Sequence, residues 1–128
     1  MKLNEMHACV AETLAYFIAS MQDVPFSPED IVIEFVKKAN MAKRARELCA
    51  LYVLDKIIND TQAQQFVTSI AANALIGREK SAVIAKADYK LNKQELRMIL
   101  FHELTHIYCA KLEMDDGEHF VGLIANSR

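Results

Sequence analysis

Two histidines and a glutamate stand close together in one apolar stretch of the sequence. The run Ile99-Leu100-Phe101-His102-Glu103-Leu104-Thr105-His106-Ile107-Tyr108 contains the pattern His-Glu-x-x-His. In an α-helix, side chains four residues apart lie on one face about 6 Å apart, so His102 and His106 can hold one metal ion. Glu103 is rotated by about 100° from His102, within reach of a water molecule on that ion. The spacing therefore predicts metal-assisted hydrolysis.

The residues around the pattern support this interpretation. Glu103 is the only acidic or basic residue between Ile99 and Tyr108. A carboxylate among apolar neighbours on a core-facing helix is costly unless something compensates its charge, and a divalent cation would do so. The alternative is a surface helix with two solvated histidines, but surface helices rarely carry so unbroken an apolar sequence.

A catalytic zinc ion usually has three protein ligands and one position for water, so a third ligand is expected. A turn at Asp115-Asp116-Gly117 would let the chain double back towards the ion. The candidates in or just after that turn are His119, Glu118, Asp115 and Asp116. We favour His119, because a neutral imidazole suits zinc. A histidine in a surface loop is the competing interpretation of that residue.

In such a site the zinc ion acidifies its water and polarises the substrate carbonyl. Glu103 would take the proton of the water and pass it to the leaving amine, as a general base and then acid. Tyr108 and Tyr89 are the phenols nearest to the site in sequence. Either could stabilise an oxyanion, although a structural role is the alternative for both.

Composition limits the remaining possibilities. The 128 residues suit a single domain, with 52% apolar and 25% charged residues. The net charge is −2 and the cations Lys37, Lys38, Lys43 and Arg44 are interpreted as a solvated helix face or end, so nucleic-acid binding is not expected. No apolar run approaches 18 residues and no signal peptide is evident, which predicts no membrane span. Three cysteines, an odd number far apart, favour reduced thiols and a cytoplasmic location.

Several elements can be placed from pattern alone. Apolar spacing predicts a helix over 4–21 with Asn4 as its cap, and a second helix over 41–58. The second helix has the apolar stripe Leu48, Leu51, Tyr52 and Ile58. Residues 30–38 are ambiguous, since Ser27-Pro28-Glu29-Asp30 suggests a helix start and the following β-branched run suggests a strand.

The second half of the chain leads to the histidine pattern. Residues 62–76 suit either a helix that stops at Gly77 or a strand that leads into a turn there. Ser81–Tyr89 alternates as a strand does. Asn92 and Glu95 form a capping-box pattern, which predicts a helix from there to about Leu112 with Leu96, Leu100 and Ile107 buried. Cys109 is interpreted as a packing residue.

The strand over 82–89, the capped link and the His-Glu-x-x-His helix resemble the zincin metallopeptidases, especially the small intracellular SprT-like and ImmA-like families. The resemblance covers roughly residues 80–120. It implies that His102 and His106 are zinc ligands, that Glu103 is the general base, and that 82–89 is the edge strand that pairs with an extended peptide. It also favours a strand at 30–38. The metzincin extension, with glycine and a third histidine soon after His106, is absent, and Phe120 follows His119 where the SprT-like pattern has glycine.

The expected fold is therefore α+β, a minimal zincin-like domain with a small mixed sheet packed on helices and a central His-Glu-x-x-His helix. The chain is expected to form one domain over 1–128, with a helical part at 1–60 and the strand, helix and ligand turn at 80–120. We expect a Zn²⁺-dependent peptidase acting on a peptide or protein. The alternatives are a catalytically silent zincin-like module that binds zinc and a protein partner, and an α+β interaction domain in which the pattern is accidental.

Overall fold

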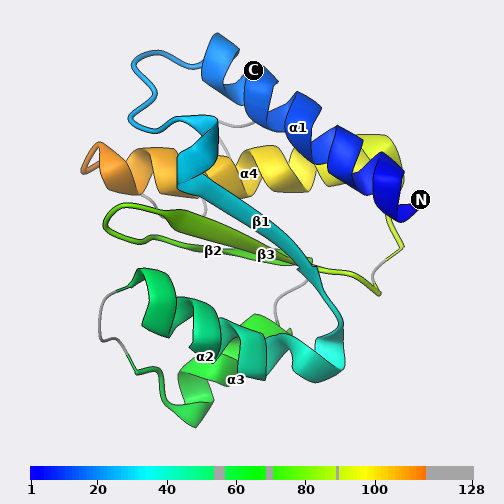
Figure 1. The fold of residues 1–128 in the computed structure, drawn as a ribbon, viewed down its shortest axis with the longest axis vertical. Helices are drawn as coiled ribbons and strands as arrows, with labels where there is room; N and C mark the ends of the chain where they lie inside the picture. Colours follow the sequence, from blue (N-terminus) through cyan, green and yellow to red (C-terminus); the bar gives the residue numbers. More distant parts are fainter. Residues whose placement is uncertain (54–56, 69–70, 89, 115–128) are drawn as a thin grey trace. The chain divides into compact units, whose positions relative to one another are not determined.

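A computed structural model describes residues 1–53, 57–68, 71–88 and 90–114 (Figure 1). These residues form an α+β fold, as expected, with four α-helices and a mixed sheet of three strands. In chain order the elements are α1 (Leu3–Ser20), β1 (Ile31–Val36), α2 (Met41–Tyr52), α3 (Asp60–Thr68), β2 (Ala72–Leu75), β3 (Ser81–Lys86) and α4 (Lys93–Lys111). Short 3-10 turns at Pro28–Asp30 and Lys38–Asn40 precede β1 and α2. None of the described helices has the length and apolar character needed to cross a membrane.

The chain divides into two compact units. Residues 1–29 and 90–128 form the first, called the helical unit here because α1 and α4 are its described elements. Residues 30–89 form the second, called the sheet unit, which holds the three strands with α2 and α3. The prediction of a single domain stays a prediction, and each unit is described by itself.

The helical unit is built by packing α1 against α4. Phe17 of α1 is fully buried, and its ring centroid lies 4.8 Å from that of Phe101 and 5.9 Å from that of Tyr108, both on α4. Phe26, from the segment after α1, stacks on the same ring at 5.9 Å. Tilted and edge-on aromatic pairs add to the burial of apolar area, so this cluster fixes α1 on α4.

The ends of both helices test the predicted caps. At α4 the Asn92 side chain accepts a hydrogen bond from the Glu95 N–H, and the Glu95 carboxylate accepts one from the Asn92 N–H, which confirms the capping box. The helix predicted at 4–21 is α1, but its cap is Lys2, and Asn4 lies inside the first turn. The Asn4 cap is therefore wrong, since its side-chain oxygen accepts only from the adjacent Glu5 N–H.

An ion-pair cluster joins the exposed sides of α1 and α4. The Glu12 carboxylate lies 3.0 Å from Arg97 and 3.3 Å from Lys93. The hydrogen bond from Arg97, and then that from Lys93, hold the pKa of Glu12 below its ordinary value of 4.5. These charges are exposed and screened by water, so their effect on stability is modest.

We expect this cluster to give a pH dependence of a definite sign. Because the pKa of Glu12 is lower in the folded chain than in the unfolded one, the stabilisation is complete above about pH 5 and is lost as the pH falls through the folded pKa. Urea midpoints of wild type and Glu12→Gln should therefore differ at pH 7 and converge at pH 3. Glu5→Gln, another α1 carboxylate, serves as the control, and a gap that stays constant with pH would contradict the assignment.

The sheet unit has the strand order β1-β3-β2. β3 runs parallel to β1, with Ile33 opposite Val83, and antiparallel to β2, where Ala74 lies opposite the same Val83. The strands expected at 30–38 and 81–89 are thus present as β1 and β3. The expectation that 82–89 is an edge strand is wrong. Both sides of β3 are occupied by neighbouring strands, so its backbone cannot pair with a further peptide.

The helices of the sheet unit cover one face of β3. Ala82 and Ile84 belong to a core that includes four buried residues of α2, namely Met41, Ala45, Leu48 and Cys49. The helix predicted at 41–58 is shorter than expected, because α2 ends at Tyr52. Of the predicted stripe, Leu48 and Ile58 are buried and Tyr52 packs against this core. Leu51 is 62% exposed, so the prediction was wrong for this residue.

Residues 62–76 proved to contain both of the structures that the sequence left open. α3 extends to Thr68, and β2 begins at Ala72. Before α3, the Asn59 side chain accepts from the Gln62 N–H while the Gln62 side chain accepts from the Asn59 N–H. This reciprocal cap starts α3 at Asp60.

Gly77, in the connection between β2 and β3, has no room for a side chain. A Cβ atom there would lie 1.9 Å from the Lys80 carbonyl oxygen and 2.6 Å from the Tyr52 carbonyl oxygen. Backbone would have to move to admit it. The Gly77 N–H also donates to the Ser81 hydroxyl at 3.1 Å, which ties the turn to the start of β3.

Gly77→Ala should therefore lower the free energy of unfolding by roughly 1–3 kcal/mol, the usual cost of overpacking. Urea unfolding followed by circular dichroism measures the change. Lys80→Ala, at an exposed position of the same turn, should shift the free energy by less than about 0.5 kcal/mol. Equal stability of Gly77→Ala and wild type would show that this close approach is absent in solution.

Candidate metal centre

The predicted site residues lie on the buried half of α4. From Leu100 to Cys109 only His102 and His106 are more than marginally exposed, and both are half-buried. Leu96 is 1% exposed and Leu100 and Ile107 are fully buried, which confirms the predicted stripe, and Leu104 is fully buried as well. Packing on nearly all sides fixes the position of this helix, so the two histidines project from a rigid support.

The two imidazoles are brought together as the spacing predicts. The His102 and His106 ring centroids lie 5.0 Å apart, with an angle of 74° between the ring planes. A zinc–nitrogen bond of 2.0–2.1 Å puts a ring centroid about 3.2 Å from the ion, and a tetrahedral angle between two such rings separates their centroids by about 5 Å. The observed separation of the ring centroids is thus compatible with the distance that two zinc-bound imidazoles require.

Glu103 lies beside them and is buried. Its side chain is 7% exposed, and its Oε2 atom and the Nε2 atom of His106 are shielded from solvent. An ionisable carboxylate is costly to bury without compensation by charge or hydrogen bonds. Its position next to His102 matches that of a proton acceptor for a water molecule rather than that of a third ligand on the same face.

The third ligand is not placed by the structure. His119, Glu118, Asp115 and Asp116 all lie outside the described residues. Within the part of the chain that is described, no group of three or more histidine, cysteine, aspartate or glutamate side chains is arranged to hold a metal ion. Of the predicted ligands, the structure therefore describes His102 and His106 alone.

Tyr108 is held by a structural contact. Its hydroxyl donates a hydrogen bond of 2.7 Å to the Gln22 carbonyl oxygen, and the ring packs edge-on against Phe17. The sequence did not predict this hydrogen bond, because Gln22 lies 86 positions from Tyr108 and no local pattern indicates the contact. The contact favours the structural interpretation over a role in oxyanion stabilisation. Tyr89, the other candidate, lies outside the described residues.

The cysteines are reduced, as expected. Cys9, Cys49 and Cys109 are all buried and form no disulfide. Cys109 is fully buried three residues after His106, which confirms that it packs in the interior.

Thr105 is a buried polar residue of the same helix. Its hydroxyl donates a hydrogen bond of 2.7 Å to the Phe101 carbonyl oxygen, so this polar group is satisfied within α4.

Comparisons with protein-family models, with curated proteins and with solved structures found no match to this chain.

The Tyr108 contact yields a test that separates structure from chemistry. Tyr108→Phe removes the donor to Gln22 and should lower the free energy of unfolding by about 1 kcal/mol. Zinc affinity and any peptidase turnover should stay within about twofold of wild type, because the phenol points at backbone rather than at a reacting group. A loss of turnover with unchanged stability would instead assign the phenol to catalysis. Tyr16→Phe, on the exposed side of α1, is the matched control.

Proposed function

We propose that this protein is a zinc-dependent metallopeptidase of zincin-like type. The observation that carries the proposal is the geometry of His102 and His106, whose rings lie 5.0 Å apart on one face of α4. The buried Glu103 beside them supplies the second element that hydrolysis needs. His119 remains our choice as third ligand, with Glu118, Asp115 and Asp116 as the alternatives.

Each residue has a distinct part in this proposal. His102 and His106 hold the ion and present it on a helix that packing keeps in place. When bound, zinc supplies the Lewis acidity that activates water and polarises a carbonyl group. Glu103 accepts the proton of the attacking water at its carboxylate and returns it to the amine that leaves when the peptide C–N bond breaks. The overall reaction consumes one water molecule for each bond cleaved.

The burial of Glu103 serves this role in a specific way. A carboxylate shielded from bulk solvent interacts more strongly with a nearby cation and with a substrate water than an exposed one does. The apolar residues around it, among them the fully buried Leu104 and Ile107, exclude competing water. The same surroundings explain why a lone carboxylate occurs in an otherwise apolar stretch.

Zinc binding is the first test. We expect about one zinc ion per chain by elemental analysis of the purified protein, and the usual three-ligand site implies strong retention on dialysis. His102→Ala and His106→Ala should each abolish that retention, whereas His7→Ala on α1 should not. Substitution with Co²⁺ gives a visible spectrum that reports coordination without reference to activity. Absence of stoichiometric metal in wild type would refute the metal centre.

Glu103→Gln then tests the reaction. This variant should keep its zinc and its fold but lose peptide cleavage by about 10²–10⁴-fold, the usual contribution of a general base. Cleavage of a mixed peptide library by wild type, read by mass spectrometry, supplies the reference rate. Turnover that survives Glu103→Gln would exclude the mechanism. Zinc retention in a wild type that cleaves nothing would favour the catalytically silent module.

A further inference from the structure

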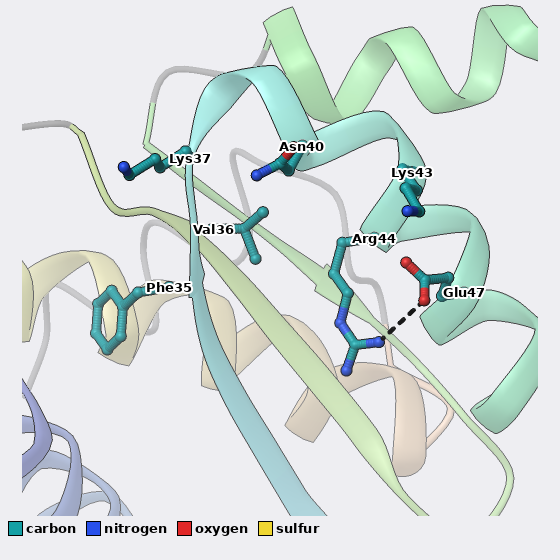
Figure 2. A pocket seen from close by; sticks show the side chains of 7 residues that line it. All are labelled: Phe35, Val36, Lys37, Asn40, Lys43, Arg44 and Glu47. Atoms are coloured by element: carbon teal, nitrogen blue, oxygen red, sulfur yellow. Dashed lines mark ion pairs between the residues drawn. The ribbon is translucent and has the colours of Figure 1, made fainter.

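The sheet unit contains an open pocket that is separate from the candidate metal centre. It has a volume of about 530 Å³ and lies where β1 leads through the 3-10 turn into α2 (Figure 2). Its lining comes from the end of β1 and from the first turns of α2, namely Phe35, Val36, Lys37, Asn40, Lys43, Arg44 and Glu47. A volume in this range is typical of sites for small molecules.

The charges around the pocket fall into two groups. Arg44 is neutralised by the protein itself, since its Nε and Nη2 atoms bond the two Glu34 carboxylate oxygens at 2.7 and 2.6 Å. A second carboxylate, that of Glu47, lies 3.6 Å from the Nη1 atom of the same guanidinium, as the dashed line in Figure 2 marks. These carboxylates raise the pKa of Arg44 above its ordinary value. Both acidic neighbours are therefore engaged by one arginine.

Lys37 and Lys43 form the second group. Both are exposed, and no ion pair joins either ammonium group to an acidic residue within the described ranges. In Figure 2 Asn40 lies between Lys37, which directly follows β1, and Lys43 on α2, and the Lys37 side chain extends away from the other two. Counted together, the three cations Lys37, Lys43 and Arg44 exceed the two carboxylates Glu34 and Glu47 by one positive charge. Lysine stems are flexible enough to turn their ammonium groups towards a shared ligand.

The wider charge distribution points the same way. Residues 30–89 hold nine of the 15 lysines and arginines but seven of the 17 aspartates and glutamates. The sheet unit is thus net positive although the whole chain has a net charge of −2. A net positive unit attracts anions, and a recess lined by cations concentrates that attraction.

We propose that this pocket binds a phosphate group, either free or carried by a small phosphorylated molecule. A phosphate monoester carries between one and two negative charges at neutral pH, which the net positive charge of the pocket and the two lysine ammonium groups attract. The ammonium groups of Lys37 and Lys43 donate charge-assisted hydrogen bonds to its oxygens, and the Asn40 amide adds a neutral donor. The volume exceeds what phosphate alone requires, so an ester has room for its organic part. The site is independent of the proposed zinc chemistry.

The experiment is a titration of the full-length chain with inorganic phosphate and, separately, with glycerol 3-phosphate, each at constant ionic strength set with chloride. Backbone ¹⁵N chemical shifts report where binding occurs, and we expect saturable changes at Lys37, Asn40 and Lys43. Lys37→Gln and Lys43→Gln should each raise the dissociation constant by about fivefold or more, the effect of one exposed charge-assisted contact. Lys80→Gln, an exposed lysine of the same unit outside the pocket, should change it by less than about twofold.

The outcomes distinguish the two sources and the failure of the proposal. Tighter binding of glycerol 3-phosphate than of phosphate assigns the pocket to phosphate esters, and equal binding assigns it to the phosphate group alone. Both substituted lysines lie at exposed positions, so melting curves should show an intact fold. Shifts that do not saturate by about 20 mM of either ligand, beyond the range of useful millimolar affinity, would overturn the site. Equal weakening by Lys80→Gln would overturn it as well.

Discussion

The burial of α4 is the constraint on which the candidate metal centre depends. Four apolar residues of this helix, Leu96, Leu100, Leu104 and Ile107, are at most 1% exposed, and each contributes about 1.5–3 kcal/mol through burial. A helix held by such packing has little freedom left to lose when a ligand binds. Folding already restricts the backbone that carries His102 and His106, so less conformational entropy would be lost when the proposed metal ion binds. The same packing that stabilises the helical unit prepares the two imidazoles for one ion.

Local signals in the sequence predicted α4 well because the interactions that form it are local. The Asn92–Glu95 cap spans three residues, and the His102–His106 pair spans one helical turn. Neither depends on how distant segments are arranged. The Asn59–Gln62 cap of α3 is of the same kind. By contrast, Asn4 has a good capping residue type, but α1 begins before it at Leu3, so Asn4 lies inside the first turn and its side chain accepts from the adjacent Glu5 N–H instead of capping the helix from outside.

The parts that the sequence could not predict depend on contacts between distant residues. Whether β3 is central or at an edge is decided by β1, which joins it from about 50 positions away, and its alternating pattern is compatible with either place. The buried face of α2 packs against Ala82 and Ile84. Residue type alone gave no sign that Leu51 is turned away from that core. The hydrogen bond from Tyr108 to Gln22 likewise depends on the packing of α1 against α4 and could not be predicted from the local sequence.

The division of charge between the two units explains how one small chain can suit ligands of opposite sign. Residues 1–29 and 90–128 carry ten acidic and six basic residues, while residues 30–89 carry seven acidic and nine basic ones. An acidic excess would favour a divalent cation at the unit that holds His102 and His106, and a basic excess would favour phosphate at the unit that holds Lys37 and Lys43, as the two proposed sites require. Mixed into one unit, these charges would cancel much of each other's field. Added salt screens both fields, so the affinity of each proposed site should fall as the ionic strength rises.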